Sequence, residues 1–400
     1  MSKAYIIHAT RTPIGSFNGA LSSVRVDDLM ANLLTDFKKK WEFSLELLDD
    51  VMIGNANQAG EDNRNLARMS LLLAEYPFSV PGTTVNRLCG SSLDATIYAY
   101  SRIMAGMGDF FLVGGAESMS RAPYVFSKAE NSFDRSQTMY DTSIGWRFPN
   151  PKMKELFPLY TMGETAEEVA KLLNISREKQ DAFAFSSHTK ALQAQKEGKF
   201  TKEIIPVEIK GKKESRIISQ DEGPRSDSTL EKLAKLKAAF RDGGTVTAGN
   251  SSSINDGASL MAIVSETFLK RYRLTPLAAI TGFGIKGTHP NTMGLGPVDA
   301  VIDLCRRVNM RTGDFDLIEL NEAFAAQALG VIEKLGLDQS KINVNGGAIA
   351  LGHPLGSSGT RILGTLIHEM NRNPSKYKTG LATMCIGMGQ GIAVSVENCL

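Results

Sequence analysis

The amino-acid sequence predicts an α/β fold with a largely parallel or mixed sheet. Short strand-like runs alternate with helix-like runs over residues 1–118, and the alternation returns from about Pro276 onward. Strands that alternate with helices are the pattern of α/β units. The intervening segment, 119–250, is richer in charge and poorer in long apolar runs, which indicates an insertion lying over an α/β body. The two α/β segments are similar in length and pattern, which hints at a duplicated unit.

In the first segment we expect a strand at Ala4–Ala9, a helix at Val26–Lys40 and a buried strand at Asp109–Gly114. Apolar residues of the helix fall on one face, at Leu29, Leu33, Leu34 and Phe37. In the insertion, a helix is expected within Asn174–Gly198, opened by a capping signature at Ser176. A short basic helix is expected at Leu230–Phe240.

The last segment predicts further strands and helices in alternation. The expected strands are Ala278–Phe283, Phe315–Leu320, Lys341–Asn345 and Gly391–Val396. The expected helices are Pro297–Val308, the run NEAFAAQALGVIEKLG that begins at Asn321, and Thr360–Met370.

The composition is that of an ordinary globular protein, with 42% hydrophobic and 22% charged residues among 400. The formal net charge of +2 argues against a surface that coats nucleic acid. No run approaches the ~20 apolar residues that span a membrane, so we expect no membrane span. The first residues read as a strand and turn rather than as a signal peptide, and the last, ENCL, match no prenylation box or peroxisomal address.

The four cysteines do not form a disulfide framework or a CxxC pair. We therefore expect no metal site and a reducing compartment, and we interpret the protein as cytoplasmic.

One cysteine lies where a strand-like run meets a helix-like run, in the stretch VNRLCGSSLDA. Cys89 is expected at or just before the helix N-terminus, where free N–H groups and the helix dipole favour a thiolate, which is a nucleophile. The alternative is that Cys89 is a small buried hydrophobe, as free cysteines often are.

Three further stretches at strand–helix junctions carry reactive groups. They are NEAF with Asn321, GGAIALGHPLGSSG with His353, and CIGMG with Cys385 and Gly387. This set suits acyl transfer, because an imidazole can activate a thiol and a second thiol can act as an acid or base. Asn321 and glycine-loop N–H groups can stabilise an oxyanion. Taken singly, His353 and Cys385 also fit structural roles, and Asn321 can cap a helix starting at Glu322.

These stretches, in this order, resemble the thiolase family. The resemblance extends to HATRTPIGSFNGAL, GGAESMS, MGETAEEVA and TAGNSSSINDGA, and so spans nearly the whole chain. The stretches GGAIALGHPLG and GLATMCIGMGQG look most similar to those of degradative 3-ketoacyl-CoA thiolases. The resemblance implies two similar α/β halves in αβαβα layers with an inserted loop domain. It places the N-terminal half at 1–118 and 251–271, the CoA-covering loop domain at 119–250 and the C-terminal half at 272–400.

The resemblance also implies a reaction in which 3-ketoacyl-CoA is cleaved to acetyl-CoA and a shortened acyl-CoA, as in fatty-acid β-oxidation. Cys89 would be the nucleophile, His353 its activator and Cys385 the acid that protonates the acetyl-CoA enolate. Asn321 would hold the water of one oxyanion hole, and backbone N–H groups of Cys89 and Gly387 would form the other.

Coenzyme A would be a substrate, with no permanently bound cofactor. The resemblance assigns its contacts to Arg225, Ser252, Phe240, Met162, Phe324 and Lys232. Short-chain family members carry a histidine where this chain has Thr161, which weakens the case for a dedicated acetoacetyl-CoA enzyme. That enzyme, working in the condensing direction, remains the alternative.

The family implies a homodimer or homotetramer and, in degradative members, a possible hydratase/dehydrogenase partner subunit. Three other functions remain open. A β-ketoacyl synthase is disfavoured by the Asn321 and Cys385 pattern with one histidine. A non-catalytic lipid carrier of the same fold is disfavoured because every catalytic position is kept. A redox protein would pair Cys89 with Cys385, yet no thioredoxin motif is present.

Overall fold

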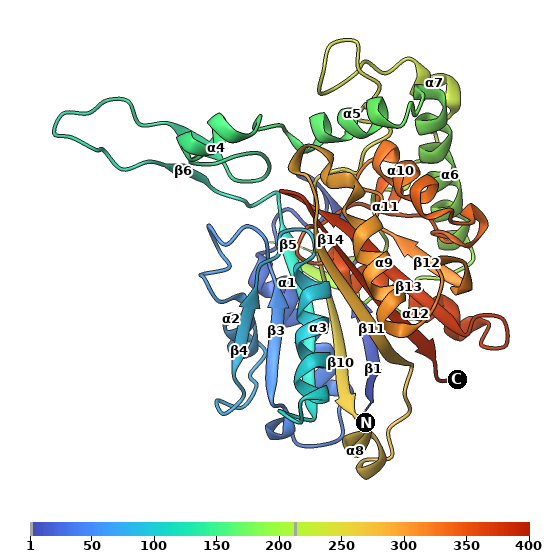
Figure 1. Cartoon of the computed structure of the whole chain (residues 1–400). Helices are drawn as coiled ribbons and strands as arrows, with labels where there is room; N and C mark the ends of the chain where they lie inside the picture. The colour runs from blue at the N-terminus through green and yellow to red at the C-terminus, as the bar shows by residue number, and fades with distance from the viewer. Residues whose placement is uncertain (1–2, 212–213) are drawn as a thin grey trace.

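The computed structural model describes residues 3–211 and 214–400, and its core is one large mixed sheet (Figure 1). The strand order is β12-β13-β14-β11-β1-β10-β5-β3-β4, and the short β2 pairs with β10. The strands are β1 (Ala4–Arg11), β2 (Gly15–Ser16), β3 (Asp50–Gly54), β4 (Gly82–Val85), β5 (Phe110–Ser118), β10 (Asn255–Ser265), β11 (Ala278–Gly287), β12 (Leu317–Leu320), β13 (Thr379–Ile386) and β14 (Gln390–Asn398).

The sheet consists of two half-sheets with the same topology, which meet where β1 runs antiparallel to β11. In one half, β4, β3 and β5 are parallel, and β5, β10 and β1 are antiparallel neighbours. In the other half, β12 and β13 are parallel, and β13, β14 and β11 are antiparallel. The repeat that the sequence hints at is therefore present in the topology.

The predicted strand at Lys341–Asn345 is wrong. The counterpart of β4 in the second half-sheet is a single parallel bridge between Ile318 and Ile342. A short 3-10 helix at Gln339–Lys341 precedes it, and Asn343 has a φ of 44°, which turns the chain away from the sheet. A left-handed residue interrupts strand geometry, and asparagine tolerates it.

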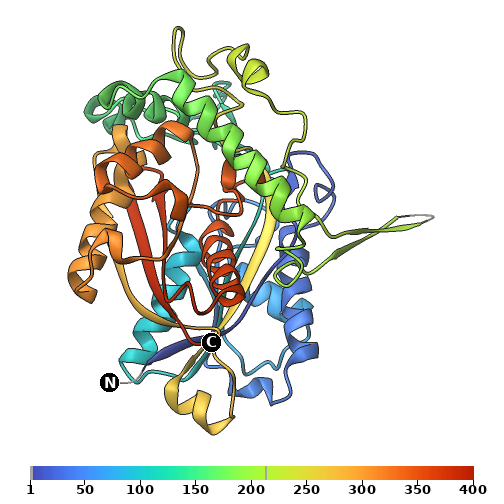
Figure 2. The ribbon, with the colours of Figure 1, turned by 90° about the vertical axis from the view of Figure 1, so that its right-hand side faces the viewer.

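Helices cover the outer faces of the two half-sheets and also lie between the half-sheets. They are α1 (Val26–Lys40), α2 (Leu66–Leu73), α3 (Ser91–Met104), α8 (Glu266–Arg271), α9 (Gly296–Val308), α10 (Ala325–Leu335), α11 (Ala348–Leu351) and α12 (Ser358–Arg372). The α3 and α12 helices pack on each other and on strands of both half-sheets, as the red helix in the centre of Figure 2 shows for α12.

The apolar clusters confirm the αβαβα layering. One cluster joins α3 and α12 to both half-sheets, a second places α1 and α2 on the first half-sheet, and a third places α9 and α10 on the second. The predicted face of α1 is confirmed, since its four apolar residues are almost fully buried. Burial of such a stripe is what holds an amphipathic helix to a sheet.

The inserted segment forms several separate pieces. They are β6 (Tyr124–Phe126), β7 (Met139–Asp141), α4 (Pro151–Leu156), α5 (Met162–Leu172), α6 (Arg177–Lys196), β8 (Val207–Lys210), β9 (Ser215–Ile218) and α7 (Leu230–Ala234). The β6–β7 hairpin and α4 form an arm at the upper left of Figure 1. The predicted cap is confirmed, since Ser176 accepts a hydrogen bond from the N–H of Lys179.

The helix expected at Leu230–Phe240 is shorter than predicted and ends at Ala234. Arg177 explains the early end, because its Nη2 donates to the carbonyls of Leu233 and Leu236. The N–H of Ala239 donates to the carbonyl of Val246, seven residues further along the loop, rather than to a helical partner.

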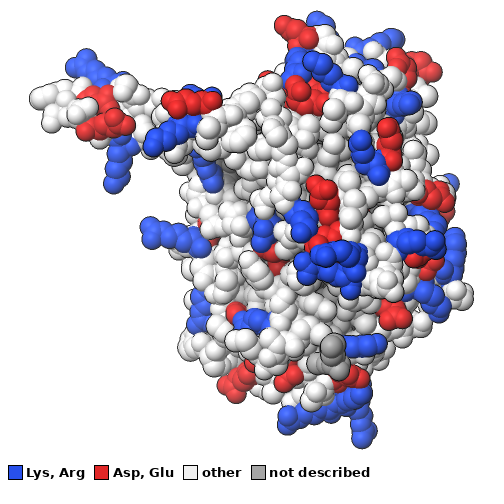
Figure 3. Space-filling model, viewed as in Figure 1, with Lys and Arg blue, Asp and Glu red and all other residues white. Residues whose placement is uncertain are grey.

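The surface carries both signs of charge, interspersed over the face in Figure 3. Within residues 3–211 and 214–400, no helix is long and apolar enough to cross a membrane. The same residues hold no cluster of three or more His, Cys, Asp or Glu side chains that could bind a metal ion.

Candidate active site

Cys89 lies in the tight turn between β4 and α3. Gly90 is the N-cap of the helix, and Leu88 before the cysteine has a φ of 48°. The hydroxyl of Ser91 accepts from the N–H of Arg87 and donates to the carbonyl of Leu88. The expected position at the helix N-terminus is confirmed.

The expected thiolate is not confirmed, because burial raises the pKa of the Cys89 thiol to about 11. Hydrogen bonds from the backbone N–H groups of Gly387 and of Cys89 itself act in the opposite direction and lower that pKa. Desolvation of the sulfur therefore raises the pKa of Cys89 more than the N–H groups at the helix N-terminus lower it. A base is needed to generate the nucleophile at neutral pH.

Cys385 lies at the end of β13, and Gly387 lies in the turn to β14. Burial raises the pKa of Cys385, and the nearby Cys89 raises it further. The turn is sharp because Met388 and Gly389 both have positive φ, at 68° and 86°. Cys89, Cys385 and Gly387 are therefore brought together by loops from the two half-sheets. All four cysteines, including these two, are free thiols.

Asn321 and His353 form the second part of the site. Asn321 follows β12, and its N–H donates to Thr383 on the strand that carries Cys385. Its Nδ2 lies 3.5 Å from Nε2 of His353, and both side chains are buried. Oδ1 of Asn321 is buried without a hydrogen-bond partner among the described residues.

The His353 ring is held from several sides. Its backbone N–H donates to Oδ1 of Asn255, and its Nδ1 lies 2.6 Å from Oγ of Ser358. Burial, with a smaller contribution from Arg361, lowers the pKa of His353 to about 3. The imidazole is therefore neutral at physiological pH, and one of its two ring nitrogens carries a lone pair without a proton.

Asn321 does not cap the following helix, which begins at Ala325 with Phe324 as its N-cap. Glu322 holds this segment instead. Its carboxylate accepts from Ser187 on α6, from Asn343 and from the N–H of Ile349, over distances of 2.7 to 3.2 Å. The NEAF turn is thereby tied to the segment that leads to His353.

A cavity of about 530 Å³ opens beside the inserted segment. Its lining includes Arg225 and Lys232, together with Ser251 and Ser253, the neighbours of Ser252. Lys232 pairs with Asp227 at 3.0 Å in an exposed ion pair. Two of the six predicted CoA contacts therefore share one cavity.

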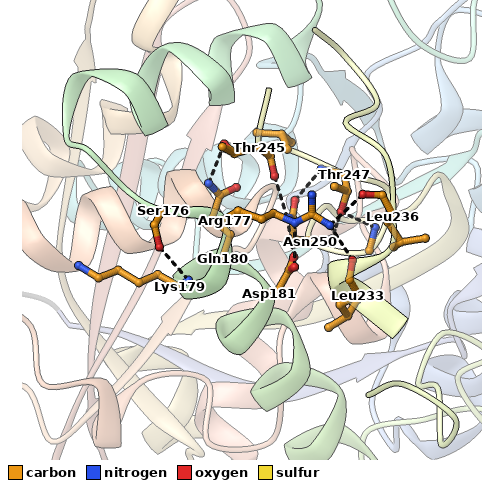
Figure 4. A network of polar contacts seen from close by, with 12 residues as sticks. Ser176, Arg177, Lys179, Gln180, Asp181, Leu233, Leu236, Thr245, Thr247 and Asn250 are labelled. Carbon is orange, nitrogen blue, oxygen red and sulfur yellow. Dashed lines mark hydrogen bonds and ion pairs between the residues drawn. The ribbon is translucent and has the colours of Figure 1, made fainter. Parts of the chain in front are cut away.

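A polar network on α6 lies next to this cavity and holds two of its lining residues, Leu233 and Leu236 (Figure 4). Arg177 pairs with Asp181 at 2.7 Å and binds the carbonyls at the end of α7, as described above. The Nδ2 of Asn250 donates to Asp181, and Nε2 of Gln180 donates to Thr245. The network fixes α7 and the 245–250 loop against α6 (Figure 4).

The apolar predicted contacts lie between the cavity and the cysteines. The Phe240 and Phe324 rings meet edge to face at 6.0 Å. Phe324 and Met162 belong to one apolar cluster with Cys385. Ser251 lines the cavity and also pairs with Phe324 through a backbone bridge. The N–H of Ser252 donates to Ala323.

The sequence patterns assigned no role to several residues that the structure brings to the site. His188 lines the cavity, and its Nδ1 accepts from the N–H of Arg225, which leaves Nε2 as the proton-bearing nitrogen. Ser358 and Glu117 lie beside the His353 loop. Glu117 and Ser358 fall within the quoted motifs GGAESMS and GGAIALGHPLGSSG, so the motifs located them without indicating their contacts.

The sequence matches a family described as thiolase over both of its domains. The N-terminal domain matches residues 4–267, and the C-terminal domain matches residues 274–398. The chain is 52% identical to a protein of Escherichia coli K12 named 3-oxoadipyl-CoA/3-oxo-5,6-dehydrosuberyl-CoA thiolase, covering 99% of this chain and 100% of that one. It is 49% identical to a protein of Pseudomonas aeruginosa named beta-ketoadipyl-CoA thiolase, covering 99% of each.

Solved structures agree with the fold. A Bacillus anthracis acetyl-CoA acetyltransferase superimposes with a TM-score of 0.93 at 38% identity, covering 100% of this chain and 99% of that chain. A human mitochondrial 3-ketoacyl-CoA thiolase superimposes with a TM-score of 0.92 at 38% identity, covering 99% of each chain.

Proposed function

The chain belongs to the thiolase family and is an acyltransferase, and we propose that it cleaves 3-oxoacyl-CoA with free CoA through an acyl-enzyme on Cys89. Two observations carry the proposal: Cys89, Cys385 and Gly387 lie together, and a neutral His353 lies beside Asn321.

In the first half-reaction, the Cys89 thiol gives its proton to Nε2 of His353, and the sulfur attacks the 3-oxo carbon. The tetrahedral oxyanion collapses, the bond between C2 and C3 breaks, and the acyl group stays on Cys89. The electron pair leaves as the enolate of acetyl-CoA, and Cys385 gives its proton to C2. The raised pKa of Cys385 supports this role, because the thiol stays protonated until the enolate forms.

In the second half-reaction, the thiol of free CoA gives its proton to the Cys385 thiolate and attacks the thioester carbonyl. Cys89 leaves and recovers its proton from His353, so all three groups return to their starting states. The reaction is a two-step covalent transfer in which each proton that is taken up is later returned. Run in reverse, Cys385 removes the proton from acetyl-CoA for a condensation.

Two sets of donors serve the oxyanions. The N–H groups of Cys89 and Gly387 already point at the Cys89 sulfur, which supports them as one oxyanion hole. Oδ1 of Asn321 accepts one hydrogen of a water molecule, and the other hydrogen of that water is donated to the second oxyanion. The unpartnered state of this oxygen supports that assignment.

The CoA substrate extends from the cavity at Arg225 and Lys232 to the cysteines. The cationic side chains of Arg225 and Lys232 suit the phosphates of CoA. The pantetheine arm then passes the side chains of Ser252, Phe240, Phe324 and Met162. We expect no permanently bound cofactor.

For the acyl group, we propose a six-carbon 3-oxo acid with a terminal carboxylate, 3-oxoadipyl-CoA. Relatives 48–52% identical over the whole chain carry 3-oxoadipyl-CoA or beta-ketoadipyl-CoA in their names. Cleavage of that substrate yields acetyl-CoA and succinyl-CoA. A straight-chain 3-ketoacyl-CoA of fatty-acid β-oxidation is the second candidate, favoured by the likeness to the human mitochondrial enzyme.

The test is kcat/KM for 3-oxoadipyl-CoA, 3-oxohexanoyl-CoA and acetoacetyl-CoA. The first two share six carbons and differ in the carboxylate, so the pair isolates recognition of that charge. We expect a preference of about tenfold or more for 3-oxoadipyl-CoA, the worth of one charge-assisted contact. A preference for 3-oxohexanoyl-CoA supports the fatty-acid role, and activity confined to acetoacetyl-CoA supports the condensing enzyme.

We also propose that the protein is a homo-oligomer. The arm of the inserted segment exposes large apolar side chains, at Tyr124, Phe126, Phe133, Met139, Phe148 and Leu156. Apolar patches of this kind mark interaction surfaces. Light scattering at size exclusion tests this directly, and a monomer at micromolar concentration refutes it.

A further inference from the structure

The Glu117 carboxylate is a buried hub at the end of β5 that accepts hydrogen bonds from four donors. Its Oε1 accepts from Nδ2 of Asn55 and from the N–H of Asn57, both at 3.1 Å. Its Oε2 accepts from the N–H of Ala56 at 2.9 Å and of Gly356 at 2.8 Å. The residue is 2% exposed. Two carboxylate oxygens offer about four acceptor sites, so its capacity is used in full.

One of these donors belongs to the loop that carries the imidazole. Gly356 lies three residues after His353, in the same turn between α11 and α12. The turn fits closely, since a Cβ on Gly356 would lie 2.8 Å from both Cα of Asn55 and the carbonyl oxygen of Gly54. A Cβ on Gly115 would meet the carbonyl of Gly356. The backbone of this loop therefore packs tightly against the ends of β3 and β5.

The other donors lead to the loop that carries the nucleophile. Ala56, whose N–H binds Glu117, accepts from Nδ2 of Asn86 at 3.1 Å. Oδ1 of Asn86 accepts from the N–H of Leu88 at 2.9 Å, and Leu88 precedes Cys89. The N–H of Asn55 also donates to Val85 at the end of β4. A chain of three hydrogen bonds thus runs from Glu117 to the backbone beside Cys89.

We propose that Glu117 is a positioning residue that sets the distance between the Cys89 sulfur and the His353 ring by tying both loops to β5. It touches neither substrate nor reacting atoms. The proposal rests on the proposed function only in taking Cys89 and His353 as the reacting pair. A misplacement of about 1 Å between such groups costs on the order of 100-fold in rate.

Two acceptor oxygens at Glu117 are what the four donors require. A glutamine in its place turns an NH2 group toward two N–H donors in either orientation, so two of the four bonds are lost. Burial raises the pKa of Glu117 to about 7, and the N–H groups of Ala56, Gly356 and Asn57 oppose that rise. The hub is retained although its desolvation is unfavourable.

The test compares Glu117→Gln with Asp49→Asn in the full-length enzyme. Asp49 serves as an exposed control carboxylate remote from the site, because one of its oxygens accepts from the backbone N–H groups of Asp109 and Phe110 at the opposite end of β5. We expect Glu117→Gln to lower kcat about 100-fold while KM for CoA stays within about threefold. Asp49→Asn should keep kcat within about twofold.

A second readout does not depend on the cleavage reaction. The pH profile of Cys89 alkylation by iodoacetamide reports how His353 activates the thiol, and Glu117→Gln should lower the rate at pH 7 while the limiting rate at high pH stays unchanged. If the wild type cleaves no 3-oxoacyl-CoA, the proposed function fails, and this readout still decides the role of Glu117.

A second variant guards against misfolding. Asn86 is exposed, and Asn86→Ala removes only the branch toward Cys89. We expect kcat to fall about tenfold with the thermal midpoint within a few degrees, as for the loss of one or two ordinary hydrogen bonds. Wild-type kcat in Asn86→Ala, or in a folded Glu117→Gln, overturns the proposal, as does an equal loss in Asp49→Asn.

Discussion

Ser358 fixes the tautomer of His353. Its Oγ lies 2.6 Å from Nδ1 of the imidazole and donates its own hydrogen to the carbonyl of Pro354 at 2.9 Å. Because that hydrogen is already used, Nδ1 of His353 must be the donor in the contact between the two side chains. The lone pair of the neutral ring then lies on Nε2, which faces Asn321. The base that the half-buried Cys89 thiol needs is thereby oriented in advance.

Replacing Ser358 with alanine should lower kcat about three- to tenfold without changing KM for CoA. The ring loses one hydrogen bond, worth about 0.5–1.5 kcal/mol, and with it the preference for a free Nε2. Steady-state kinetics check this, and Ser358→Thr, which keeps the hydroxyl, should restore most of the rate. A change in KM alone would contradict the orienting role.

Cys385→Ala should separate the two kinds of chemistry. Without the second thiol, the enzyme should still accept an acyl group from an acyl-CoA onto Cys89, yet carbon–carbon cleavage should fall by about 100- to 10,000-fold, the range for a lost general acid. Intact-protein mass spectra follow the acylation, and thiolytic assays follow the cleavage. Cleavage at the normal rate would refute the assignment of Cys385.

His353 should make the fold sensitive to acid. Its pKa is about 3 when folded and 6.5 when unfolded, so below pH 6.5 the unfolded chain binds a proton that the native state does not. The contribution of His353 to stability is complete above 6.5 and is lost as the pH falls toward 3. At pH 5 the loss is about 2 kcal/mol. Urea denaturation of His353→Asn should show a correspondingly smaller drop between pH 7 and pH 5, whereas an equal drop would contradict the buried neutral ring.

Arg225 and Lys232 should contribute unequally to CoA binding. Lys232 is exposed and already paired with Asp227, so Lys232→Ala should raise KM for CoA by about threefold or less. The side chain of Arg225 makes no hydrogen bond or ion pair to the described residues, so its donors are available to a phosphate. Arg225→Ala should raise KM about 10- to 100-fold. Equal effects of the two substitutions would place the phosphates elsewhere in the cavity.

The sequence predicts those parts of the fold that local patterns encode. The α1 helix has its predicted bounds because fifteen consecutive residues determine both its apolar face and its length. The strand expected at Lys341–Asn345 fails because the left-handed Asn343 ends the pairing after one bridge. The helix at Leu230 ends early because of Arg177, more than fifty residues away. Such long-range contacts have no local signature.

In the candidate site, too, local sequence predicts some features, whereas others depend on the folded surroundings. The motifs identify Cys89, His353, Cys385 and Asn321 by residue type and order, but their electrostatics depend on burial. The helix N-terminus alone predicts a thiolate at Cys89, whereas the folded surroundings raise its pKa to about 11. The contacts of Glu117 likewise depend on loops from both half-sheets.

The most direct test of the account is to mix the enzyme with 3-oxoadipyl-CoA in the absence of free CoA and to measure its intact mass. We predict that the wild type gains one succinyl group, which peptide mapping places on Cys89, and that Cys89→Ala gains none. Subsequent addition of CoA should remove the group and release succinyl-CoA. A wild-type protein that forms acetyl-CoA without ever carrying the acyl group, or a Cys89→Ala variant that retains thiolysis, would contradict the central claim.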